Sequence, residues 1–411
     1  MSEDFKAHPS WIAGAGTAVK TIGGNASDIA KFVEQYCPVA PEGFGGKILD
    51  PLTGPFQVSA DATRARHSGI AYLTLATANQ LNRAAWTYHD KDQQTQASFD
   101  RMTTTLADGI PGEPGSGASR PFTAYPGAEK FELPNAISVD PPSAAPPELA
   151  DLIAETTGVV GDVNEAIKNV TRMAGSEINL LEKAVAPVTA NWNELRRIGE
   201  CYKVAGNAME QSGLNLDYAV GQVGPHWDGR AAVAFEDWAR RQSAAMKWEG
   251  PVGRVISDVL TMVADQIREG VRLICEKLRD FVASYVDFRS TKEIFKQLVK
   301  KIPVIGTALE ILDLARKIWQ VVDLVTGIVQ RIEDLRNRVM ELLQFLADPV
   351  NKTKEWVVEK LEPFTSRASD VAQVTALAAD VDKITDVDRT LDRPQHSYDP
   401  GHGNQPWENA G

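Results

Sequence analysis

The sequence has few of the residues that build disulfide frameworks and metal sites. Its 411 residues include only three cysteines (Cys37, Cys201 and Cys275) and six histidines. The cysteines are odd in number and far apart, so they predict neither a disulfide framework nor a Cys-x-x-Cys metal pair. The histidines show no metal-ligand spacing. We therefore expect no metal and no cofactor.

Long apolar runs are missing as well. No stretch of about 18 uncharged apolar residues occurs, although a membrane-spanning helix needs roughly that length. The nearest stretch, 302–330, contains five charged residues that a single lipid-facing helix would not tolerate. The N-terminus shows no basic segment followed by an apolar one, so we expect no cleaved Sec signal peptide.

Basic residues are outnumbered, with 43 Lys and Arg against 55 Asp and Glu and a net charge of −12. This balance argues against nucleic-acid binding, which favours a basic surface. Basic residues exceed acidic ones within 268–301, where a solvated helix face is the favoured interpretation. The nucleophile-elbow, phosphate-loop and dinucleotide motifs are also missing. We therefore expect a protein that is not an enzyme and assign no catalytic residue.

Helical periodicity is what the sequence does contain. Apolar residues recur at spacings of three and four within 58–108, residues 8–36 are weakly helical, and almost no stretch alternates with period two. The Pro- and Gly-rich stretch 37–56 separates these two helices, so 1–108 predicts a helical hairpin. Residues 109–147 are rich in proline, glycine and serine and predict a linker.

The second half of the chain predicts another hairpin and further helices. In 148–298 the helical pattern resumes near Glu148, stops at 221–225 and restarts at Arg230. Residues 299–365 predict additional helices, of which 306–347 folds back antiparallel on 255–298. The polar segment 366–411 predicts a largely disordered tail. The fold class is all-α: two long helical hairpins docked as a four-helix bundle, extended by a further antiparallel helix pair.

Two short motifs stand out. Trp227 and Gly229 form a W-x-G at the turn between two helices, where a large apolar ring suggests packing against another part of the molecule. Tyr88 and Asp92 form a Y-x-x-x-D near the end of the second helix and share one helix face. Taken alone, Tyr88 reads as a core residue and Asp92 as a solvated acid.

Together the two motifs resemble those of type VII (ESX) secretion substrates. In that family two hairpins pair antiparallel into a four-helix bundle. One hairpin presents W-x-G at its turn, and the other presents Y-x-x-x-D/E just past its second helix, at the same end. Residues 1–105 resemble the excreted virulence factor C type, and 148–290 resemble the Trp-x-Gly, PPE-like partner. The resemblance implies that Tyr88, Asp92, Trp227 and Gly229 form a composite export signal.

The resemblance implies a non-enzymatic substrate or component of type VII secretion. Such a protein is cytoplasmic before export and secreted or at the cell surface afterwards. Its implied partners are the secretion ATPase and, as a further candidate, an ESX chaperone. The resemblance also predicts that Trp227 lies close to residues 84–92, at the same end of the bundle.

Other interpretations remain open. The apolar helices of 255–347 and the basic run raise the alternative of a secreted effector that interacts with a membrane surface or forms a pore or ring. A toxin is disfavoured because too few residues follow Ser366 to form an enzyme core. The long linker leaves pairing of the hairpins within one chain, or between chains of a homo-oligomer, as alternatives.

Overall fold

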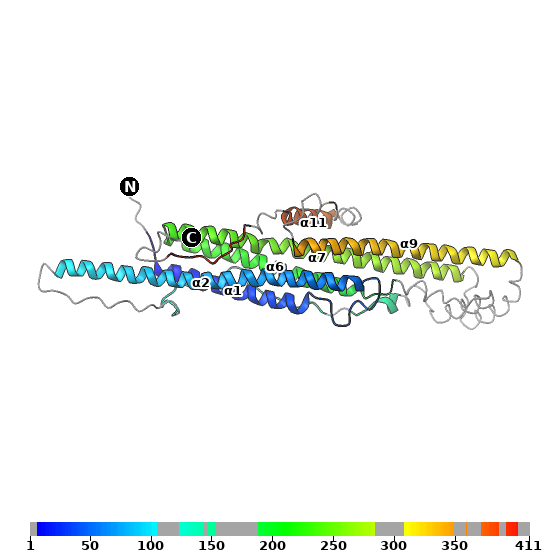
Figure 1. Ribbon diagram of the computed structural model, residues 1–411, viewed down its shortest axis with the longest axis horizontal. Helices are drawn as coiled ribbons and strands as arrows, with labels where there is room; N and C mark the ends of the chain where they lie inside the picture. The colour runs from blue at the N-terminus through cyan, green and yellow to red at the C-terminus, as the bar shows by residue number, and fades with distance from the viewer. Residues whose placement is uncertain are drawn as a thin grey trace.

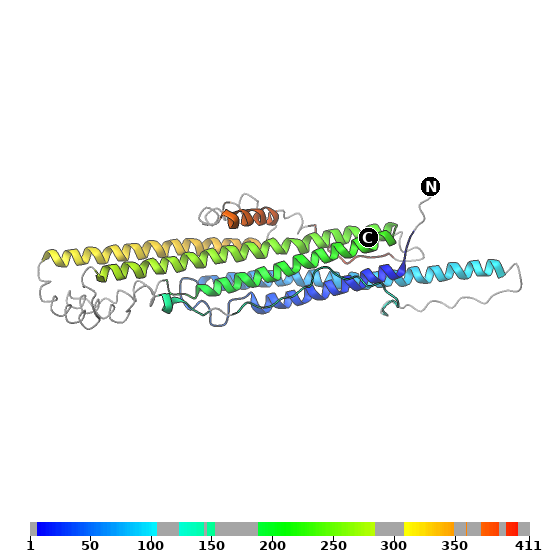
Figure 2. The ribbon, with the colours of Figure 1, turned by 180° about the vertical axis from the view of Figure 1, so that it is seen from behind.

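The computed structural model describes residues 6–104, 123–143, 146–152, 188–283, 308–348, 359, 371–385 and 392–401. Within these ranges the long elements are helices, and the only β pairing is an isolated bridge between Ala7 and Trp227. The all-α fold class is therefore confirmed. Figures 1 and 2 show the long helices side by side in an elongated bundle.

The first hairpin consists of α1 (Pro9–Tyr36) and α2 (Thr53–Thr104). Pro9 suits the first turn of α1, where no intrahelical partner for its missing N–H is needed. Between the helices, the Pro- and Gly-rich loop ends in the short helix η1 (Asp50–Leu52). This loop is part of the core, because Phe44, Leu49 and Leu52 are fully buried.

The second hairpin consists of α6 (Trp192–Val223), the short helix η3 (Gly224–His226) and α7 (Arg230–Ala283). Helices α6 and α7 approach closely: a Cβ added at Gly206 would lie 2.4 Å from the carbonyl oxygen of Glu249. Helix α7 is continuous through Pro251.

The two hairpins pack together through α1 and α6, and side chains join α2 to α7. For example, Gln242 donates from its amide to the Ile70 carbonyl oxygen and to Thr74. Helices α1 and α7 start, and α6 ends, at the same end of the bundle. Tyr88 on α2 also lies at this end of the bundle, which we call the motif end. The predicted four-helix bundle is confirmed.

Helix α9 (Ala308–Ala347) extends the bundle as predicted. It runs back along α7, as Figure 1 shows, and it also contacts α2. Its inner face buries residues at helical spacing: Val321, Val325, Ile328, Ile332, Leu335, Val339 and Leu342. The remainder of the predicted helices in 284–307 and 349–365 lies outside the described residues, apart from residue 359.

The linker is not a free tether in the parts that the structure describes. The Glu129 N–H donates to the Ser10 carbonyl on α1, and Asn135 exchanges hydrogen bonds with Asn215 on α6. Phe131 packs against the ring of Trp11. Residues 129–135 therefore lie along the seam between α1 and α6.

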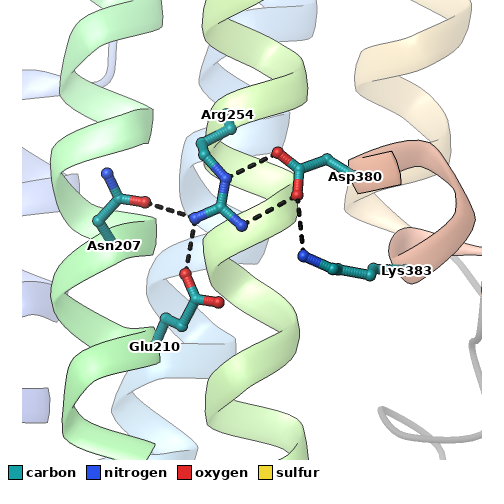
Figure 3. A network of polar contacts seen from close by, with 5 residues as sticks. All are labelled: Asn207, Glu210, Arg254, Asp380 and Lys383. Carbon is teal, nitrogen blue, oxygen red and sulfur yellow. Dashed lines mark hydrogen bonds and ion pairs between the residues drawn. The ribbon is translucent and has the colours of Figure 1, made fainter. Parts of the chain in front are cut away.

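Two parts of the C-terminal segment 366–411, residues 371–385 and 392–401, lie within the described residues and pack on the bundle, and for the segment as a whole the expected disorder stays a prediction. Residues Val371–Ile384 form helix α11, which packs on α7, and Leu377 and Ile384 are buried. Figure 3 shows the polar contacts, in which Arg254 on α7 bonds both carboxylate oxygens of Asp380. Average composition misses this docking because a few well-placed apolar and charged side chains are sufficient for it.

Candidate functional site at the motif end

The W-x-G turn has a backbone that requires glycine at its third position. After η3, Trp227 is extended, with φ −145° and ψ 115°. Gly229 then has φ +94°, in the left-handed region where a Cβ is unfavourable. The Gly229 carbonyl accepts from the Val233 N–H and so joins the turn to α7. Glycine here is explained by the turn itself.

Trp227 packs across the boundary between the two hairpins. Its side chain is 2% exposed, and its indole N–H donates to the Tyr88 hydroxyl oxygen at 3.3 Å. The two rings meet edge to face with centroids 6.4 Å apart. Phe235 stacks on Trp227 from α7, at 5.9 Å. The predicted proximity of Trp227 to residues 84–92 is confirmed, and it includes a direct hydrogen bond.

The N-terminal residues Lys6 and His8 also bond the backbone of the W-x-G turn. The Asp228 N–H donates to the Lys6 carbonyl at 2.8 Å, and the His8 N–H donates to the His226 carbonyl at 3.0 Å. Trp11 stacks on the His226 ring with centroids 3.7 Å apart. Sequence reasoning missed this contribution, because a single β-bridge leaves no periodic pattern.

Tyr88 and Asp92 occupy different environments although they share one helix. Tyr88 is buried, and burial raises the pKa of its phenol even though the hydrogen bond from Trp227 acts in the opposite direction. The phenol is therefore neutral and acts as a structural partner. Asp92 is exposed one turn later. Helix α2 continues to Thr104, so the motif lies within the helix and not past its end.

The outer face of the Y-x-x-x-D segment is held by the linker. The Trp86 indole N–H donates to the Thr123 carbonyl at 2.8 Å, and Asn82 bonds the backbone of both Thr123 and Tyr125. The Tyr125 hydroxyl lies 3.1 Å from Nδ1 of His89. Burial raises the pKa of Tyr125, and the negative charge of Asp92 acts in the same direction. Asp92 therefore lies beside a surface built from both α2 and the linker.

A buried polar cluster holds α2 against α7 farther along the bundle. Arg66 donates from Nε and Nη2 to the two carboxylate oxygens of Glu249, at 2.8 and 3.1 Å. His67 lies 3.3 Å from the same carboxylate, and the Arg66 guanidinium lies over the Trp248 ring. Burial alone would raise the pKa of Glu249, but the neighbouring positive charges hold it well below its ordinary value. The ion pair of Arg66 and Glu249 joins α2 of the first hairpin to α7 of the second.

The described residues offer no metal site or membrane-spanning helix at the motif end, and the hollow lined by α9 lies away from it. They include no group of three or more His, Cys, Asp and Glu side chains placed to hold a metal ion. None of the helices described is both long and apolar enough to cross a membrane. A hollow of about 660 Å³ lies at the opposite end, lined by the loop 45–48, Thr189 and α9 residues that include Glu333 and Arg336.

The motif end is thus a composite of both hairpins, the N-terminal residues and the linker. The geometry brings Trp227, Gly229 and Tyr88 together, and it places Asp92 on the exposed surface one helical turn from Tyr88. Comparison of the chain with protein-family models, with curated proteins and with solved structures finds no match.

Proposed function

We propose that this protein is a non-enzymatic substrate or component of type VII (ESX) secretion. In this proposal the W-x-G and Y-x-x-x-D motifs act as one composite export signal. The observation that carries it is the hydrogen bond from the Trp227 indole to the Tyr88 hydroxyl, which joins the two motifs across the hairpins. The contact joins two residues that lie 139 positions apart in the sequence and holds both motifs at one end of the bundle.

The two halves of the signal have different physical roles in this proposal. Trp227 and Tyr88 are buried, so they orient the segment of α2 that carries the exposed residues. Asp92 is exposed and can accept hydrogen bonds or an ion pair from the secretion ATPase. An ESX chaperone is a second candidate partner, because residues 92–96 of α2 are exposed and offer a helical surface.

An export assay in a host that carries the ESX ATPase tests the proposal. We expect Asp92→Ala to abolish export while the purified variant unfolds at the same temperature as the parent, since Asp92 is exposed. Asp90→Ala is the matched control, because Asp90 lies two positions earlier and on a different face of α2. Export of the control should be normal and should depend on the ATPase.

Variants of Tyr88 test whether the buried residues of the signal act by orienting α2, as distinct from the direct contact that Asp92 makes with the ATPase. Tyr88→Phe keeps the ring and removes the hydroxyl that accepts from Trp227. We expect reduced export and a loss of about 1–3 kcal/mol of stability, because the buried indole N–H is left without this acceptor. Tyr88→Ala should abolish export. Normal export of both Tyr88→Ala and Asp92→Ala, or export that is independent of the ATPase, would contradict the proposal.

The described residues do not favour the membrane-interacting or ring-forming alternative. The apolar residues on α7 that motivate it, among them Val263, Ile267 and Ile274, are buried in the bundle. Of the basic residues, Arg268 pairs with Glu148, and Arg272 pairs with two acids on its own helix. Flotation of the full chain with anionic liposomes is the measurement that would revive this alternative.

A further inference from the structure

The segment 392–401 lies in a groove between α2 and α7 at the motif end. It has no helical or strand structure, yet Pro394, Tyr398, Pro400 and Gly401 are buried. The segment belongs to neither hairpin, and the W-x-G and Y-x-x-x-D motifs do not explain why it packs here. Its contacts are those of a peptide held between two helices.

Three polar contacts fix the backbone and register of this segment. The Trp238 indole N–H donates to the His396 carbonyl at 3.0 Å, and the Tyr398 N–H donates to the Thr77 hydroxyl at 3.0 Å. Arg83 donates to the Asp399 carboxylate at 2.9 Å. The donors and acceptors therefore come from both helices, two of them from α2 and one from α7.

An aromatic pocket fixes the side chain of Tyr398. Its ring meets Trp227 edge to face at 6.2 Å and Phe235 at 5.7 Å, and it is fully buried. Its hydroxyl is buried without a hydrogen-bond partner among the described residues. An unpaired buried hydroxyl weakens binding, so the pocket fits a phenyl ring better than it fits a phenol.

We propose that this groove is a peptide-binding site and that residues 396–401 of the same chain are its ligand. The pattern that it selects is a segment without regular secondary structure that has a free backbone carbonyl, an aromatic residue two positions later and an acid directly after that. The backbone of the segment is bound by Thr77 and Trp238, and its acid is bound by Arg83. The aromatic ring is bound by Trp227 and Phe235.

The groove shares Trp227 with the composite motif. The ring of Trp227 meets Tyr88 and Tyr398, so the bound segment supports one side of the tryptophan and α2 supports another. Occupancy of the groove therefore affects the surroundings of Trp227. Another segment with the same pattern would compete for the groove and expose residues 396–401.

A cleavable full-length chain tests this inference with purified protein. A specific protease site inserted between Thr385 and Asp392 allows the C-terminal fragment to be released from its covalent link. We expect the cleaved fragment to stay bound during gel filtration, and a labelled synthetic peptide of residues 392–401 to exchange with it. The intrinsic tryptophan fluorescence should change on exchange, because two tryptophans contact the segment.

Three peptide variants make the test specific. Tyr398→Ala should lower the affinity of the labelled peptide for the cleaved chain at least about tenfold, which corresponds to about 1.4 kcal/mol of binding free energy. Tyr398→Phe should bind at least as tightly as the parent peptide, since the buried hydroxyl has no partner. His396→Ala is the matched control, because its side chain is exposed and only its carbonyl is bound.

The inference is overturned if the fragment leaves the cleaved chain at once, or if Tyr398→Ala binds as tightly as the parent peptide. A cleaved chain that holds its fragment only as a dimer would place the ligand on a second copy and would equally refute the assignment to the same chain. The binding test does not involve export, so it can fail while the proposed function holds, and the converse is also true.

Discussion

Replacing Arg66 with methionine should strongly destabilise the bundle, because it leaves the Glu249 carboxylate buried without its main partner. The side chains of Arg66 and Glu249 are 11% and 3% exposed, and two hydrogen bonds join them. Removing one partner of a buried pair typically costs about 3–5 kcal/mol. Methionine keeps most of the apolar volume of the arginine stem, so the loss reports the charge and not a cavity.

The effect depends on pH in a defined direction. The pKa of Glu249 in the folded protein lies below its ordinary value, so its stabilisation is complete above the unfolded pKa of about 4.3 and is lost as the pH falls through the folded value. In Arg66→Met the buried carboxyl instead favours its protonated form. The difference in unfolding free energy between parent and variant should therefore be largest near neutral pH and shrink on acidification.

Urea unfolding followed by circular dichroism, at neutral pH and again near pH 4, measures both effects. Lys31→Met is the matched control, because Lys31 forms an exposed pair with Asp28 whose contribution should stay below about 1 kcal/mol. The double variant Arg66→Met/Glu249→Met should recover much of the loss, since it removes both charges. A single-variant loss under about 1 kcal/mol at neutral pH would refute this account of the cluster.

Three further predictions concern other parts of the molecule. Gly229→Ala should lower stability by about 1–2 kcal/mol in thermal unfolding, because alanine strains a backbone at φ +94°. Arg254→Leu should make α11 more susceptible to limited proteolysis while the rest of the bundle resists, because Arg254 is the residue that bonds both carboxylate oxygens of Asp380. The buried thiols of Cys201 and Cys275 should react with a thiol reagent at pH 8 only as fast as the protein unfolds, because burial raises the pKa of each to about 11.

The sequence alone predicted the helices well, because their signal is local. The predicted helix at 306–347 is observed as Ala308–Ala347, and the predicted start at Arg230 is the start of α7. In both helices the apolar spacing follows the helical repeat and the faces bury against neighbours, so local pattern and tertiary packing agree. The proximity of Trp227 to Tyr88 came from a family resemblance, not from periodicity.

The contacts made by irregular segments could not be predicted from local pattern. Tyr398 is one aromatic residue in a polar segment, and its burial depends on Trp227 and Phe235, which lie more than 150 residues earlier in the chain. Arg66 and Glu249 are likewise 183 residues apart, and each looks like an ordinary charge on a helix face. The one available signal was an aromatic residue among prolines and glycines, which is also common in unstructured tails.

The docked linker bears on whether the hairpins pair within one chain. Glu129 bonds Ser10 of the first hairpin, and Asn135, six residues later, bonds Asn215 of the second. Both contacts form at once where α1 and α6 lie side by side in one bundle. In a swapped pair Asn215 of a second copy would take the place of this partner, so the two arrangements differ in which chain supplies the second hairpin. A docked linker also keeps the second hairpin near the first, which raises the effective concentration for pairing within the chain. The linker contacts therefore favour assembly of the motif end from a single chain.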